Sequence, residues 1–232
     1  MKKLCFAALM TSAFLATPLV AQENDATKRL GEAGKAFTEI MSVEDKAIPG
    51  SILDKAECVA IIPGMKKGGF IVGGSYGKGA VSCRSKGASA WGAPLMISIG
   101  GGSLGLQIGG QAADYVFLVM NPKGMEYLLR SQFTLGADAA VAAGPVGRTG
   151  SAGTDLRMHA EILSYSRTRG LFVGLSLEGA VVKQDKDGNE NLYGERVDPK
   201  RVLEQGRYAV PPEAKGFVSV LENASPRHKA SS

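Results

Sequence analysis

Two glycine-rich segments of the chain place a serine in the spacing that serine hydrolases use. GGSYG at 73–77 and GGSLG at 101–105 both match the pattern G-x-S-x-G. In hydrolases this pattern sets the serine on a sharp turn between a strand and a helix, where a histidine removes the hydroxyl proton. The sequence thus contains the parts for one remote enzymatic hypothesis, a serine hydrolase that uses Ser75 or Ser103 with His159 as its base.

The residues around these serines favour a strand over the turn and helix that an active-site motif needs. The second segment also matches the nucleotide-binding pattern G-x-G-x-x-G, which likewise requires a helix directly after the glycines. Between positions 104 and 109, large apolar residues instead alternate with small or polar ones, which is the period of a strand. We therefore expect a protein that is not an enzyme and has no nucleotide or other cofactor, and whose glycines let backbones approach closely.

Arg167 and Arg169 are the residues most suited to bind an anion. They stand two positions apart in a predicted strand, so their side chains project from the same face. A guanidinium group forms paired hydrogen bonds with a phosphate, so this pair predicts a phosphate or lipid-headgroup site, with Arg148, Lys66 and Lys67 as companions. The alternative is that these arginines form structural ion pairs with nearby acids.

The positive charge of the chain is concentrated in its central part. The whole sequence carries a formal net charge of +5, and residues 58–170 hold eleven bases against five acids. Residues 22–57 are acidic, with five bases and eight acids, and residues 171–232 hold nine of each. A basic central segment favours an anionic partner, and for an exported protein a phospholipid surface or an acidic glycan fits better than nucleic acid. A solubilising surface charge is the alternative.

The first 21 residues have the organisation of a secretory signal peptide. Lys2 and Lys3 precede an uncharged apolar run, and Ala21 stands before a polar segment. We therefore expect an exported protein, periplasmic or associated with the cell envelope. Cys58 and Cys83 remain after cleavage, and in an oxidising compartment they form either one disulfide or two separate buried thiols. Without a nearby histidine they do not indicate a metal site.

Hydrophobic periodicity predicts helices at both ends of the mature chain. Apolar residues recur at helical spacing over 25–42, and SILDKA at 51–56 follows a capping pattern. A further helix is expected at 121–133, and two short ones in the tail. KQDKDGNEN at 183–191 is interpreted as a solvated turn, because Asp-Gly favours turns.

Between these helices the sequence predicts a sheet. From 58 to 182, glycine and β-branched residues form runs of strand length, and a weak repeat between 69–81 and 170–181 suggests two equivalent strands. We predict an α+β protein, a single domain with a glycine-rich, mainly antiparallel β-sheet body, sandwich or barrel-like, and flanking helices. Its parts are a signal peptide (1–21), an N-terminal amphipathic helix (22–44), the body (45–205) and a C-terminal helix with a polar tail (206–232).

Several long motifs of the body resemble the SYLF lipid-binding domain family. They are WGAP at 91–94, GGSLGLQIGGQAAD at 101–114, VFLVMN at 116–121, LGADAAVAAGPVGR at 135–148 and ILSYSRTRGLFVGLSLEGA at 162–180, in the order of the family. The resemblance, to an exported bacterial member, covers roughly residues 45–185. It implies a non-enzymatic domain of mixed sheet and helix that binds membranes with anionic lipids. Eukaryotic members bind phosphoinositides, and some bind actin filaments.

The residues and the resemblance together lead to one main function and one alternative. We expect a non-enzymatic lipid-binding module that contacts anionic phospholipid membrane surfaces in the cell envelope, with envelope proteins as further candidate partners and neither nucleic acid nor metal as a ligand. The alternative is a structural or protein-interaction domain without a lipid ligand. The helix at 25–42 either inserts into the membrane or packs on the core, and its net acidity disfavours membrane contact.

Overall fold

The computed structural model of the chain describes residues 24–43, 47–69, 72–84, 90–104, 111–146, 160–168, 171–172 and 177–226. Its centre is a nine-stranded sheet. The strands are β1 (Cys58–Gly69), β2 (Val72–Cys83), β3 (Leu95–Leu104), β4 (Gln111–Val119), β5 (Gln132–Thr134), β6 (Val141–Ala143), β7 (Ile162–Thr168), β8 (Leu171–Phe172) and β9 (Val181–Gln184). The helical elements are α1 (Asp25–Met41), α2 (Gly50–Leu53), α3 (Pro122–Leu128), α5 (Lys186–Tyr193), η1 (Lys200–Glu204), η2 (Pro212–Ala214) and α6 (Lys215–Ala224).

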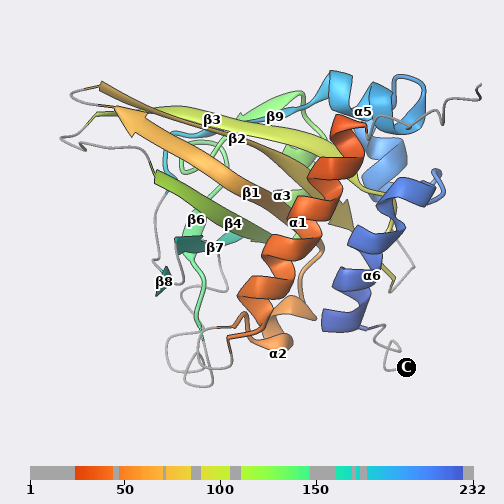
Figure 1. Ribbon diagram of the computed structural model, residues 1–232, viewed down its shortest axis with the longest axis horizontal. Helices are drawn as coiled ribbons and strands as arrows, with labels where there is room; N and C mark the ends of the chain where they lie inside the picture. The colour runs from red at the N-terminus through yellow and green to blue at the C-terminus, as the bar shows by residue number, and fades with distance from the viewer. Residues whose placement is uncertain are drawn as a thin grey trace, which may run out of the picture.

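The sheet has the strand order β5-β9-β3-β2-β1-β4-β7-β6, and β8 pairs with β7. Among the described strands, every pairing is antiparallel except that of β6 with β7. The long strands β1 to β4 form its middle, and the short strands lie at its ends (Figure 1). The predicted α+β domain with a mainly antiparallel sheet and flanking helices is therefore confirmed.

Both faces of the sheet are buried at the start of β1, and alternation along this strand shows how. Val59 and Ile61 pack on one face beneath α1 and α6, which we call the outer face. Cys58, Ala60 and Ile62 point to the inner face, where the sheet curls so that side chains of β5, β7 and β9 meet those of β1 and β3. A strand with two buried faces carries apolar residues at successive positions, which explains the run CVAII at the start of β1.

Helix α1 packs on the sheet instead of projecting from it. Asn24 caps its first turn, since its side chain accepts a hydrogen bond from the backbone N–H of Ala26. Its apolar stripe, with Leu30, Phe37 and Ile40 at most 1% exposed, lies against β1, β2 and α6. The helix predicted at 25–42 is thus confirmed, and its apolar face is occupied by the core.

The segment predicted as a turn at 183–191 forms helix α5, so that prediction was wrong. Asp185 accepts a hydrogen bond from the backbone N–H of Gly188 and caps the helix, which ends at Gly194 with a positive φ of 73°. The Asn189 side chain bonds both the N–H and the C=O of Met96 in β3. These tertiary bonds and the cap outweigh the local turn preference of Asp-Gly.

The two copies of the weak repeat are not equivalent strands. The first copy lies in β2, at the middle of the sheet. In the second copy, β8 pairs with β7 and the chain at Glu178 and Gly179 turns before β9 begins at Val181. Cys58 and Cys83 stand opposite each other on β1 and β2 and form a disulfide, as one of the two sequence-based alternatives predicted.

Candidate functional site

Ser75 does not stand on the turn that a hydrolase nucleophile needs. It lies inside β2, opposite Gly101 of β3, and its hydroxyl donates a hydrogen bond to the Gly101 carbonyl oxygen at 3.3 Å. Ser103 also lies in β3, and His159 falls outside the described residues. An extended strand on both sides of Ser75 leaves no helix N-terminus or elbow to activate its hydroxyl.

Arg167 is held by an acid of the helix that covers the sheet. Its guanidinium forms an ion pair with Glu39 of α1, and its side chain is 22% exposed. It stands opposite Asp114 on β4, beside a groove of about 370 Å³ whose charged lining residues are Glu32, Glu39, Asp114 and one base, Lys35. A phosphate that bound Arg167 would have to replace Glu39 and approach two further carboxylates. Arg169 and Arg148 lie outside the described residues, so the predicted arginine pair stays a prediction.

Lys66 and Lys67 point to opposite faces of the sheet, because successive residues of a strand alternate. Lys67 lies on the inner face, where its Nζ is 5.5 Å from the centroid of the Tyr115 ring. Lys66 is exposed on the outer face. Neither lysine forms an ion pair with any residue in the described part of the chain. The structure therefore places Lys66 and Arg167 on one face and Lys67 on the other.

The far ends of β1 to β4 extend beyond the helices as a four-stranded projection, which we call the arm (Figure 1). It comprises residues 65–69, 72–77, 100–104 and 111–113, and none of these is acidic. On its outer face, Ala112, Lys66, Tyr76 and Gly100 form one row across the four strands. A Cβ at Gly100 would lie 3.4 Å from Cδ2 of Tyr76, so the ring lies over this glycine.

Tyr76 is one of two large hydrophobic residues that are exposed in the described part of the chain, with 56% of its surface in contact with solvent. Lys66 stands directly opposite Tyr76. On the same face, one row further along the sheet, Ser98 of β3 pairs with the exposed Lys183 of β9. Sequence reasoning did not select Tyr76 or Lys183. Strand alternation places Tyr76 on the face of Lys78, but the pairing of β1 with β2 was needed to bring it beside Lys66.

Most other described bases of the central segment are neutralised by acids. Asp185 accepts a hydrogen bond from Arg29 at 2.7 Å and contacts Lys78 at 3.0 Å. Burial by itself would raise the pKa of the Asp185 carboxyl, but the bonds from Lys78 and Gly188 and the charges of Lys78 and Arg29 hold the pKa below its usual value. Lys123 likewise pairs with the buried Glu161. These ion pairs connect elements of the fold. Among the described bases of the central segment, Lys66 and Lys67 of the arm have no acidic partner, nor does Arg130, which lies over the ring of Tyr127.

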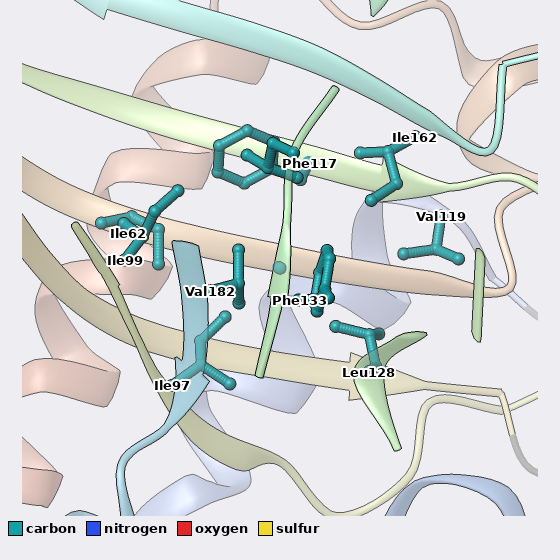
Figure 2. Close-up of a pocket in the computed structure, with 11 residues that line it drawn as sticks. Ile62, Ile97, Ile99, Phe117, Val119, Leu128, Phe133, Ile162 and Val182 are labelled. Atoms are coloured by element: carbon teal, nitrogen blue, oxygen red, sulfur yellow. The ribbon is translucent and has the colours of Figure 1, made fainter. Parts of the chain in front are cut away.

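The interior of the curled sheet contains a small apolar cavity (Figure 2). Its volume is about 20 Å³. Every lining side chain is hydrocarbon: Ala60, Ile62, Ile97, Ile99, Phe117, Val119, Leu128, Phe133, Leu135, Ile162 and Val182. A water molecule there would find no hydrogen-bond partner, so only apolar groups suit this space.

The described part of the chain has neither a metal-binding cluster nor a membrane-spanning helix. No group of three or more His, Cys, Asp or Glu residues there is arranged to hold a metal ion. None of the helices described is long and apolar enough to span a bilayer.

The chain is similar to one family of known proteins. The family model described as "Ysc84: Las17-binding protein actin regulator" matches residues 100–224. SH3 domain-containing protein PJ696.02 of Schizosaccharomyces pombe is 34% identical over 200 residues, which cover 83% of this chain and 46% of that protein. Protein YSC84 of Saccharomyces cerevisiae is 31% identical over 204 residues, covering 85% of this chain and 42% of the relative.

A vertebrate relative aligns over a larger share of its own length. SH3 domain-containing YSC84-like protein 1 of Xenopus laevis is 31% identical over 217 residues, covering 91% of this chain and 64% of that protein. This chain thus spans about half the length of the fungal relatives that it matches. The family match covers more than half of the chain and agrees with the motifs that resemble SYLF domains. The chain therefore belongs to the Ysc84 family of SYLF-domain proteins.

Proposed function

We propose that this chain is a non-enzymatic binding module of the cell envelope that contacts anionic phospholipid surfaces through the outer face of the arm. One observation carries the proposal. Lys66 and Tyr76 lie side by side, exposed, on a projection that has no acidic residue. A lysine near an anionic leaflet contributes about 1 kcal/mol, and a tyrosine suits the boundary between headgroups and hydrocarbon.

A row of glycines on the outer face of the arm supports contact with an extended surface. Around Tyr76, the exposed outer-face positions Gly68, Gly74 and Gly102 carry no side chain, and they form the next row across β1, β2 and β3. Such a face allows Lys66 and Tyr76 to reach a plane without obstruction. Helix α1 contributes no apolar residue to this contact, because its apolar face is packed against the sheet.

The test is sedimentation with vesicles of graded anionic lipid content. Lys66→Gln with Lys183→Gln removes two charges from the outer face and should weaken binding by roughly thirtyfold, about 2 kcal/mol. The matched comparison is Arg167→Gln with Arg169→Gln. If Arg167 is structural, this variant binds vesicles as the parent does but unfolds more easily. Binding should weaken as salt rises and be slight on neutral vesicles.

A second candidate function is a protein-interaction domain without a lipid ligand. The family description, Las17-binding protein actin regulator, favours it, as does the name LAS seventeen-binding protein 3 of a relative from Saccharomyces cerevisiae. If the parent protein ignores vesicles at every anionic content, this candidate replaces the lipid proposal, and the arm becomes the first surface to test for a protein partner.

A further inference from the structure

On the inner face of the sheet, Tyr115 has a buried hydroxyl without a hydrogen-bond partner. Its side chain is 0% exposed, and no donor or acceptor among the described residues bonds its oxygen. Native proteins satisfy nearly all buried polar groups, with protein, water or ligand. The phenolic hydroxyl of Tyr115 is therefore available to a group that enters the inner face.

Lys67 lies against the same ring. Its Nζ is 5.5 Å from the centroid of Tyr115, and it has no acidic partner in the described part of the chain. An ammonium group is a donor only, and a phenol donates readily to a carboxylate. Lys67 and Tyr115 are thus two neighbouring donors without an acceptor, which is the arrangement that an anionic group requires.

The apolar cavity begins next to this pair. Phe117 follows Tyr115 on the same face of β4 and stacks on it, with ring centroids 6.0 Å apart and planes 8° from parallel. Ile62 stands opposite Tyr115 in the β1–β4 ladder. Both Phe117 and Ile62 line the cavity, and Figure 2 shows their side chains converging with those of Ile99 and Val182. The inner face therefore passes from polar to wholly apolar along β4.

In its present form the cavity holds about one methyl group, so a longer chain has to displace part of its wall. Leu128 of α3 and Phe133 of β5 form that wall, and both elements are short. Strand β5 has three residues and, among the described strands, pairs with β9 alone, at the end of the sheet. The backbone bonds that continue this pairing, from Gln184 N–H to the Ser131 carbonyl oxygen and between Leu135 and residues 179–180, join the same edge of the sheet. This wall is thus held from one side, and it is the part of the interior that we expect to move.

We propose that the inner face binds one single-chain anionic amphiphile of the fatty-acid class. The carboxylate meets Lys67 and the hydroxyl of Tyr115, and the hydrocarbon chain enters the cavity between β4, β9 and the α3–β5 wall. A few polar groups at the mouth of an apolar space are the usual form of a small-molecule site. This site goes beyond the proposed function, since it lies on the opposite face from Lys66 and Tyr76 and takes a single molecule from solution.

The experiment is isothermal titration calorimetry of the mature protein with decanoate below its micelle concentration. Lys67→Gln should weaken binding about tenfold or more, because a charge-assisted hydrogen bond is lost. Lys66→Gln is the matched control: it is the adjacent residue, has the same chemistry and lies on the other face, so binding should change less than twofold. Decyltrimethylammonium, with the same chain and a cationic head, should not bind.

Two further variants test the hydroxyl and the cavity. Tyr115→Phe should weaken decanoate binding several-fold while leaving the melting temperature of the ligand-free protein equal or higher, since it removes an unsatisfied polar group. Val182→Ile adds one methyl group to the cavity and should weaken binding without loss of stability, since filling a cavity is neutral or stabilising.

The proposal is overturned if the parent takes up no decanoate, if Lys66→Gln and Lys67→Gln have equal effects, or if decyltrimethylammonium binds as well as decanoate. Vesicle sedimentation decides the proposed function separately, because it depends on Lys66 and not on Lys67.

Discussion

Replacing Asp185 by asparagine tests how helix α1 is attached to the sheet. The side chain of Asp185 is 8% exposed and forms ion pairs with Arg29 and with Lys78 of β2. The side chain of Arg29 is 9% exposed. Asp185→Asn preserves the shape and the capping of α5, because asparagine is also a good N-cap. It leaves Arg29 buried, with the exposed Asp25 as its one remaining acidic partner among the described residues.

The expected loss follows from this burial. Removing one partner of a buried ion pair typically destabilises a protein by about 3 to 5 kcal/mol. We expect about 3 kcal/mol here, since Asp25 still compensates part of the charge of Arg29. For a domain of this size the melting temperature should fall by roughly 6 to 12 °C. Asp187→Asn, an exposed acid in the first turn of the same helix, is the control and should change stability by less than about 0.5 kcal/mol.

Urea unfolding at several pH values gives the measurement. The pKa of Asp185 is lowered in the folded protein, so its contribution is fully present above the pKa of the unfolded chain, near 4, and is lost as pH falls through the folded value. The parent and Asp185→Asn should therefore differ most at neutral pH and converge in acid. A difference below 1 kcal/mol at pH 7, or one that persists unchanged at pH 2, would refute this account of the Arg29–Asp185–Lys78 network.

Two further predictions concern the centre of the sheet. The oxidised protein should show no free thiol from Cys58 and Cys83 when unfolded, and two titratable thiols would contradict the disulfide. Changing both to alanine should lower the free energy of unfolding in urea by about 3 kcal/mol, given a sequence separation of 25 between them. Gly79→Ala should prevent or severely impair folding, because its Cβ would lie 1.9 Å from the carbonyl oxygen of Ile61. Gly74→Ala is the control and should be tolerated, since the nearest neighbour of its Cβ would be 4.0 Å away. Circular dichroism of both variants is the measurement, and a stably folded Gly79→Ala would mean that β1 and β2 are further apart.

The fold was largely predictable because its main elements follow local patterns of hydrophobicity. In α1, β1 and β4 the buried positions carry apolar residues, so the spacing of apolar residues in the sequence predicts these elements. Helix α5 was missed because it depends on a distant contact. Asn189 bonds Met96, which is 93 residues away, and the pKa of Asp185 is lowered by Lys78 and Arg29, which lie on other elements. A local turn signal carries no information about either contact.

The candidate site was predictable only in part, for the same reason. Strand alternation alone separates Lys66 from Lys67, and this part of the site follows from the sequence. The pairing of Arg167 with Glu39 does not, because the two residues are 128 positions apart. The hydroxyl of Tyr115 gives no signal in the sequence either, since a lack of partners is visible only when every neighbour is placed.

Long-range ion pairs join the acidic and basic segments of the chain. In the sequence, the acidic segment at 22–57 and the basic segment at 58–170 look like separate regions. In the fold, an acid of α1 neutralises Arg167, and Asp185 of the C-terminal part neutralises Lys78. Lys66 and Lys67 lie where neither of these acids reaches, on an arm whose described residues include no acid. An anionic partner is therefore expected at Lys66 or Lys67, one on each face, and the adjacent glutamine variants of these two lysines separate a membrane on the outer face from an amphiphile on the inner one.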